Sequence, residues 1–240
     1  NSTMSLPGAY AGGQVATGAQ VGMLGNRSVM NTPFSQTGYT NQTIKDQQAL
    51  TLQNVLANDP SVITTTQSGG STFERTTIRG FETRSFGAAG SLNGLMGIAP
   101  VQSPDIDYVE RVEVLRGPSA LLNGMAANSG GVGGTVNLRT KQAGDEPLAQ
   151  LTTRYISRGQ VGAHVDFGQR FGDQKEFGVR FNGAFRKGDT PIEPQSTEVG
   201  SAALNLDYRG ERVRLSADIA HQSDRARPYN QQMLDVWGIG

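Results

Sequence analysis

The part of the chain after residue 147 alternates apolar and polar side chains at every second position. In residues 160–171, for example, Val161, Val165 and Phe167 alternate with glycine or polar neighbours. Because successive side chains of a β-strand point to opposite faces, a period of two predicts consecutive antiparallel strands of about ten residues each. Five segments show this pattern, at residues 151–155, 160–171, 176–187, 199–209 and 211–223.

Two kinds of sheet alternate in this way, a soluble β-sandwich and a transmembrane β-barrel. The strands are longer than the usual five or so residues, and arginine and aspartate occupy their polar face in mid-strand, as a wet lumen would require. Tight connections at residues 172–175 and 209–211 contrast with a long one at 188–198, which is typical of outer-membrane barrels. We favour the barrel and keep the sandwich as the alternative. The aromatic residues expected to form part of an interfacial girdle beside the tight turns are Phe171, Phe177 and Tyr208.

The composition excludes several classes of function. Lys and Arg together number 21, as do Asp and Glu, so the formal net charge is zero and nothing favours a nucleic acid as partner. The absence of cysteine excludes a thiolate nucleophile, a disulfide framework and a cysteine-ligated metal. Neither His164 nor His221 lies at ligand spacing from a carboxylate or a second histidine. We therefore expect no catalytic residue, no metal site, no cofactor and no enzymatic activity.

The first 147 residues lack the period of two. Residues 1–40 are rich in Gly, Ser, Thr and Asn, and we expect an extended or loosely ordered lead-in. Apolar residues at helical spacing predict a helix over 43–57, with Thr43 and Asp46 resembling a capping box and Pro60 ending it. The remaining β-type segments are 62–66, 72–79, 108–115 and 132–140, with one helical turn at 118–123.

Short strands, long loops and one helix predict a small α+β domain. We place it at residues 41–147, after the lead-in at 1–40 and before about five strands of a larger barrel at 148–240. Its carboxylate pairs, Asp105 with Asp107 and Glu110 with Glu113, lack the apolar flanks that acid–base catalysis needs. At a period of two, the first pair shares one face of the chain.

A glycine-rich stretch between the last two strands of this domain resembles a phosphate loop at first sight. It contains no G-x-x-x-x-G-K-[ST], and Val136 occupies the position that G-x-G-x-x-G requires after Gly131 and Gly133. No helix pattern follows, although a phosphate site needs a helix N-terminus there. We infer that these glycines permit tight turns and close approach of the backbone to itself. The glycines concerned are at positions 117, 124, 130, 131, 133 and 134.

The run VERVEVLRGPSALLNGMAANSGGVGGTVNLRTK, residues 109–141, resembles the plug domain of TonB-dependent outer-membrane receptors, particularly the siderophore receptors. The family pattern V-E-x-[LIV]-[KR]-G-P, L-x-G and G-G-x-[IV]-N-x-x-[TS]-[KR] is met in order. Earlier segments also match, at 51–62, at 76–81 with TTIRGF, and at 91–97 with SLNGLMG. Asn93 stands where the family commonly has Asp, a departure that we expect to adjust only a turn.

The resemblance implies a plug that fills a barrel of about 22 strands. Residues 148–240 hold too few strands for closure, and an open edge cannot face lipid, so we expect the chain to be a fragment. The implied function is import of a ferric siderophore across the outer membrane of a Gram-negative bacterium, with the plug gating the barrel. The implied partners are TonB with its energising inner-membrane complex, and lipid and lipopolysaccharide. We expect a monomer at full length and a TonB box upstream of Asn1.

Three alternatives remain open at this stage. The cargo could instead be cobalamin or a carbohydrate, the chain could belong to a regulatory transducer, or it could be a soluble all-β binding module. The lead-in at 12–35 resembles those of siderophore receptors, which favours iron.

The resemblance also implies roles for individual residues. Ligand contacts in this family lie on loops at the extracellular apices of the plug, and two arginines before glycines pair with glutamates of the barrel wall. The predicted anchoring residues are Arg79 and Arg116. The predicted ligand-binding residues, which combine a cation, an aromatic ring, a flexible apolar chain and an amide, are Arg84, Phe86, Met96 and Gln102.

Overall fold

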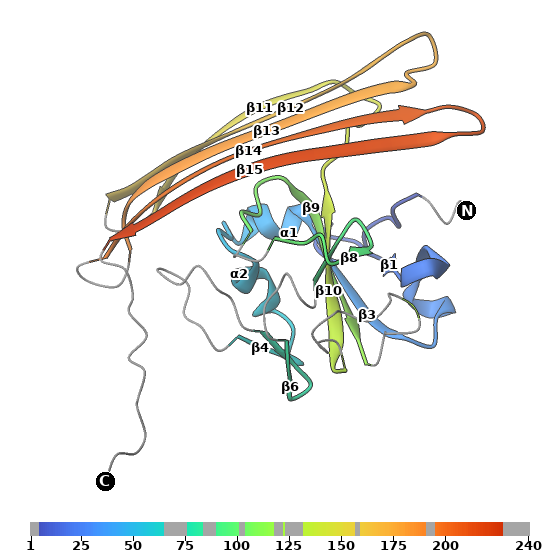
Figure 1. The fold of residues 1–240 in the computed structure, drawn as a ribbon, viewed down its shortest axis with the longest axis horizontal. Coiled ribbons are helices and arrows are strands. Elements are labelled where there is room, and N and C mark those ends of the chain that lie inside the picture. The colour runs from blue at the N-terminus through green and yellow to red at the C-terminus, as the bar shows by residue number, and fades with distance from the viewer. Residues whose placement is uncertain are drawn as a thin grey trace.

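The computed structural model describes residues 5–64, 76–83, 90–100, 104–117, 122, 132–156, 159–190 and 195–227. It has two parts, a long five-stranded sheet and a more compact α+β body that lies against one face of it (Figure 1). We call the sheet the wall and the body, residues 5–141, the inner domain.

The wall has the strand order β11-β12-β13-β14-β15, and every neighbouring pair is antiparallel. All five strands were predicted from the period of two, and β12 begins and ends at the predicted residues. The bounds are β11 Leu148–Ile156, β12 Gln160–Phe171, β13 Phe177–Asp189, β14 Ser196–Arg209 and β15 Arg214–Arg227.

The two faces of the wall differ in polarity, as the alternation predicted. In β12, Val161 and Phe167 are exposed on the outer face, whereas His164 and Asp166 are buried against the inner domain. Large apolar side chains are exposed on the other strands too. They include Leu151, Tyr155, Phe177, Phe181, Phe185, Leu206, Leu215 and Ile219.

The tight turns were predicted correctly. Residues 172–176 join β12 to β13 and residues 210–213 join β14 to β15, and Figure 1 shows both turns at the same end of the wall. The long loop expected at 188–198 is shorter, because Gly188 and Asp189 still pair with Thr197 and Ser196 and leave only 190–195 as the connection.

The inner domain is built around a mixed five-stranded sheet of order β3-β9-β10-β7-β8, in which only β10 and β7 are parallel. A three-stranded sheet β4-β5-β6 and a β1-β2 hairpin complete it. The central strands are β3 Ser35–Thr40, β7 Gly90–Leu92, β8 Leu95–Met96, β9 Val109–Arg116 and β10 Gly134–Thr140. The other elements are β1 Gly18–Gln20, β2 Asn26–Ser28, β4 Val62–Thr64, β5 Thr76–Ile78, β6 Phe81–Thr83 and the 3-10 helices η1 Gly22–Leu24 and η2 Val29–Asn31.

The N-terminal lead-in is more ordered than its composition suggested. Strand β3 pairs with β9 along six residues, so the central sheet begins before the expected domain boundary at residue 41. The sequence hid this strand because Tyr39 is its one large apolar buried residue, and Gln36 and Thr40 are buried polar residues. The Gln36 amide donates to the backbone carbonyl of Arg27 at 3.1 Å.

The single helix expected over 43–57 was wrong: the structure has two, α1 Asn41–Asp46 and α2 Leu52–Leu56. Gln48 adopts a φ of 50°, which ends α1, because a left-handed residue is a common helix stop. The expected capping box was also wrong, since the Thr43 hydroxyl donates to the Gln14 carbonyl at 2.5 Å. The capping box lies instead between Thr51 and Asn54, at the start of α2.

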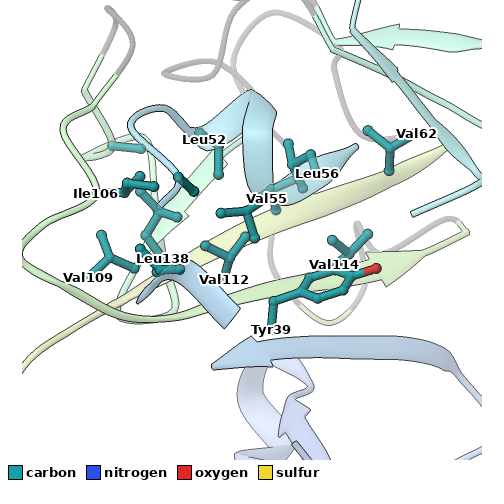
Figure 2. Packing of buried hydrophobic residues seen from close by; sticks show 14 of the residues in the cluster. Tyr39, Leu52, Val55, Leu56, Val62, Ile106, Val109, Val112, Val114 and Leu138 are labelled. Atoms are coloured by element: carbon teal, nitrogen blue, oxygen red, sulfur yellow. The ribbon is translucent and has the colours of Figure 1, made fainter. Parts of the chain in front are cut away.

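The break between the helices lets both of them bury apolar side chains on the same face of the central sheet. Ile44 from α1 and Leu52, Val55 and Leu56 from α2 are almost completely buried. Figure 2 shows the α2 side chains packed with residues of the strands. Their partners include Val109, Val112 and Val114 of β9, Leu138 of β10, Ile106 and Tyr39.

The described glycines of the glycine-rich stretch serve close backbone packing, as inferred. A side chain at Gly133 would collide with the carbonyl oxygen of Ile78, and one at Gly134 with the carbonyl oxygen of Leu115. Gly117 has a φ of 97° and donates its N–H to the Gly133 carbonyl at 2.8 Å. No helix in the described part of the chain is long and apolar enough to span a bilayer.

Candidate functional site: the interface between inner domain and wall

Charged side chains on the inner face of the wall meet acidic groups of the inner domain. The guanidinium of Arg154 on β11 donates to both carboxylate oxygens of Asp107, at 2.6 and 3.0 Å. The side chains are 15% and 5% exposed, so the pair lies largely out of water. This two-bond geometry fixes direction as well as distance.

The carboxylate of Asp105 makes a second junction, a short way along the same segment. Arg186 on β13 donates to it at 3.0 Å, and the hydroxyl of Ser201 on β14 donates to its other oxygen. The backbone N–H of Asp105 donates to the Gln222 side chain on β15 at 2.8 Å. One residue of the inner domain therefore bonds three strands of the wall.

The third junction is the buried ammonium of Lys141, the residue at which the inner domain ends. It donates to Asp166 on β12 at 3.0 Å, to Asn182 on β13 at 3.2 Å and to the backbone carbonyl of Asp107 at 2.6 Å. Arg180 donates two further hydrogen bonds to Asp166, at 2.6 and 2.9 Å. Burial lowers the pKa of Lys141, and the charge of Asp166 opposes that shift.

A fourth junction fixes the connector between the two parts. Arg170 on β12 donates to both carboxylate oxygens of Asp207 on β14, at 2.8 and 3.1 Å. The same guanidinium donates to the backbone carbonyl of Ala143 at 3.1 Å, and Arg209 donates to that carbonyl as well, also at 3.1 Å. The connector is thereby held at the end of the wall that carries the tight turns.

These four junctions can hold and orient the inner domain, and their geometry offers no catalytic chemistry. Each acid faces a cation that donates directly to it, whereas a general acid or base needs an open approach to a substrate. Ion pairs out of water contribute little net stability, but breaking one of them leaves a buried charge without a partner. Among the described residues, no group of three or more histidines or acids could hold a metal ion.

The two arginines predicted to anchor the plug have different surroundings. Arg116 forms an ion pair with Asp59 and donates to Ser61 and Thr37, at 2.8 Å each, all within the inner domain. Arg79 is exposed and has a φ of 53°. Among the described residues, neither arginine makes a hydrogen bond or an ion pair with strands β11–β15. Their pairing with glutamates of a barrel wall therefore stays a prediction.

Of the residues predicted to bind ligand, Met96 lies in the described part of the chain. It is half-buried in β8, next to Leu95, which is 62% exposed, and close to Ile98, which is 56% exposed. Arg84, Phe86 and Gln102 lie outside the described residues. Their contact with ligand stays a prediction.

Sequence reasoning found half of the interface. It placed Asp105 and Asp107 on one face, and it identified the mid-strand arginines and aspartates as facing a lumen. It did not single out Lys141 as an interface residue. The signal that could have revealed it is the number of charged residues on the inner face of the wall strands. Such charges require opposite charges on the domain that packs against this face.

The fold and this interface define a class of protein. Residues 28–132 match the family model described as the TonB-dependent Receptor Plug Domain. The inner domain is thus a plug, and the antiparallel strands after it correspond to the barrel strands of the same receptors. The chain therefore contains a TonB-dependent receptor plug domain, and its plug and wall strands together are similar to those of solved outer-membrane receptors, in line with the sequence resemblance.

The relatives to which the chain is similar are receptors. The crystal structure of BauA, the ferric preacinetobactin receptor from Acinetobacter baumannii, is 48% identical, with a TM-score of 0.86 over 91% of this chain and 32% of that one. The ferrichrome receptor FcuA of Yersinia enterocolitica is 41% identical over 89% of this chain and 28% of its own length. A hemin receptor of Yersinia enterocolitica is 29% identical over 86% of this chain. The chain spans about a third or less of the length of these relatives.

Proposed function

We propose that this chain is part of a longer outer-membrane receptor that imports a ferric siderophore, with the inner domain as the plug that gates the barrel. The observation that carries the proposal is the likeness to BauA, a ferric preacinetobactin receptor, which extends over the plug and the wall strands together. The likeness to the ferrichrome receptor FcuA points to the same class of cargo. The role is transport, and the ferric chelate is cargo rather than a cofactor.

The outer face of the wall supports a place in the outer membrane of a Gram-negative bacterium. Its exposed aromatic and aliphatic side chains form an apolar surface that water would not favour but lipid would. Phe177 and Tyr208 pack with their ring centres 5.0 Å apart beside the tight turns, where an interfacial aromatic girdle is expected. Lipid and lipopolysaccharide are therefore proposed as partners of this face, and the soluble module becomes the weaker alternative.

The buried junctions support a plug that stays closed unless force is applied. Freeing the plug from the wall separates Asp107 from Arg154 and Lys141 from Asp166, and each separation leaves charges in a poorly solvated site. We propose that TonB, driven by its inner-membrane complex, supplies the work for this step. The expected point of attachment is an N-terminal TonB box.

The ligand end of the plug is proposed to lie at the loops that carry Arg84, Phe86, Met96 and Gln102. A cation, an aromatic ring and an amide suit an anionic or hydroxamate-rich ferric chelate. Alanine at Arg84 and at Phe86 in the receptor should weaken its affinity for the ferric siderophore. Unchanged affinity in both variants would remove these residues from the proposed site.

Growth under iron limitation tests the function. A strain that lacks its own siderophore and haemin receptors is given the receptor gene and supplied singly with ferrichrome, ferric preacinetobactin and haemin. We expect rescue by a ferric siderophore, and loss of that rescue when the TonB gene is deleted. Rescue by haemin alone would show that the cargo is haemin and not a ferric siderophore. Rescue that survives loss of TonB would contradict the proposed mechanism.

A further inference from the structure

Asn93, at the tip of the hairpin between β7 and β8, joins the plug to the last strand of the wall. Its side-chain amide donates to the carboxylate of Asp218 on β15 at 3.0 Å and to the Thr140 hydroxyl at 2.9 Å. Its side-chain oxygen accepts from the backbone N–H of Thr140 at 3.0 Å. One small side chain therefore contacts the central sheet of the plug and the barrel wall together.

The backbone of this hairpin does not require asparagine. Asn93 and Gly94 have φ angles of 52° and 84°, the left-handed pair typical of two-residue Asn-Gly and Asp-Gly turns. The N–H groups of both residues are bonded, to the Leu138 carbonyl and to the Asn137 side chain, at 2.8 Å each. Asparagine and aspartate fit such a turn equally well.

The contact with Asp218 of the wall distinguishes asparagine from aspartate at position 93. Asparagine offers an N–H donor to Asp218, whereas an ionised aspartate would offer only acceptors. Asp218 already accepts a hydrogen bond from Asn205 at 3.0 Å, so it is oriented as an acceptor. Aspartate at position 93 would place two carboxylates at hydrogen-bond distance, which is unfavourable for both.

We propose that Asn93 is a positioning residue whose amide seats the β7–β8 hairpin on the wall, and that Asp218 dictates asparagine rather than aspartate at this position. The hairpin carries Met96, one of the proposed ligand contacts. A cavity of about 250 Å³ lies beside the joint and is bordered by Leu92, Ile98, Tyr108 and Asp218 among others. The position of the hairpin therefore shapes the space next to the proposed ligand end.

The test is a reciprocal exchange in the receptor, with the variants Asn93→Asp, Asp218→Asn and the two combined. Exchange of backbone amide hydrogens in residues 90–97 is the readout that does not depend on cargo. We expect Asn93→Asp to speed this exchange by about threefold to tenfold, a typical range for coupled neighbours. The double variant should return to within about twofold of the parent, because the new amide at position 218 would then donate to the new carboxylate at position 93.

A matched control separates a specific contact from a general effect of charge. Asp173→Asn removes an exposed carboxylate from the tight turn at 172–176, which joins β12 to β13 and is separated from β15 by β14. Combined with Asn93→Asp, it should give no rescue. Rescue by Asp173→Asn, no rescue by Asp218→Asn, or no effect of Asn93→Asp would each overturn the inference.

Binding of ferric siderophore by the same variants extends the test to function, and this readout alone rests on the proposed function. Affinity should fall with Asn93→Asp and recover in the double variant. If the parent receptor binds no ferric siderophore, the proposed function fails, while the exchange measurements still decide whether Asp218 selects asparagine.

Discussion

Asp107 of the plug and Arg154 of the wall meet through two parallel hydrogen bonds, at 2.6 and 3.0 Å, although they are 47 residues apart in the chain. The contact is almost closed to water. Because each buried charge meets its counter-charge only when the plug is docked, the pair makes the docked position of the plug specific even if it adds little net stability.

Removing one partner of this pair should loosen the plug. Arg154→Ala leaves Asp107 buried without its counter-charge, and such a loss typically costs about 3–5 kcal/mol. We expect the free energy of local opening in β9, measured by hydrogen exchange of the receptor, to fall by an amount in this range. Arg154→Met combined with Asp107→Leu should cost clearly less, because no charge is stranded.

An exposed ion pair on the wall provides the control for that experiment. Lys187 and Glu198 lie 3.0 Å apart with the lysine 64% exposed, where water screens the attraction. Lys187→Ala should leave the opening of β9 unchanged. Equal effects of Lys187→Ala and Arg154→Ala would show that the buried pair does not hold the plug.

The wall could be predicted from the sequence because its pattern is local and repeated. Four of the five strands are 12 to 14 residues long, so the period of two is repeated many times in each. One face of the sheet meets the plug and the other does not, so the polarity of a residue indicates the face on which it lies. The plug is harder to predict, because its strands are short. In β3 a single large apolar residue, Tyr39, is buried, and the buried Gln36 and Thr40 donate to backbone carbonyls of the lead-in, which leaves no periodic signal.

The ion pairs between plug and wall could not be predicted, for a physical reason. Which charges meet depends on the register of the wall strands and on the height at which the plug docks, and neither is encoded within a short window. Arg116 shows the same limit, since its acidic partner in the structure is Asp59, which precedes it by 57 residues. The sequence correctly indicated that Gly133 permits close approach of the backbone to itself. It did not indicate which group approaches, which is the carbonyl of Ile78.

Stability of the plug should depend on the protonation of Glu113. Burial raises the pKa of this carboxyl above its ordinary value, and a hydrogen bond from Asn137 at 2.7 Å only partly opposes the shift. Between the two pKa values the folded plug holds a proton that the unfolded chain has lost, so stability falls as pH rises through that window. We expect Glu113→Gln to be more stable than the parent above the window and to have a flatter pH profile.

Urea titration of the receptor at several pH values, followed through exchange of β9 amides, measures this effect. The exposed Glu146 supplies the control, since Glu146→Gln should follow the parent profile. A Glu113→Gln variant whose stability parallels the parent at every pH would contradict the assignment of the pH dependence to this carboxyl.

The close contact at Gly133 should make even a methyl group costly. In Gly133→Ala the new side chain overlaps the backbone carbonyl of Ile78, which cannot rotate away as a side chain could. Overpacking of this kind typically costs about 1–3 kcal/mol. The urea midpoint for unfolding of the plug should fall accordingly, whereas Gly8→Ala, which has no atom within 4 Å of the added carbon, should leave it unchanged.

Charge on the outer face of the wall should interfere with membrane insertion in a way that depends on depth. Phe181 lies in the middle part of β13 with its side chain outward and 39% exposed, so in the proposed setting it meets the hydrocarbon core. Phe171 is also outward, but it ends β12 beside a tight turn, where the membrane interface is expected. Lysine costs about 2–4 kcal/mol at the bilayer midplane and about 0–1 near the interface. Folding of the receptor into lipid vesicles should therefore be destabilised much more by Phe181→Lys than by Phe171→Lys, and equal effects of the two would argue that this face does not contact lipid.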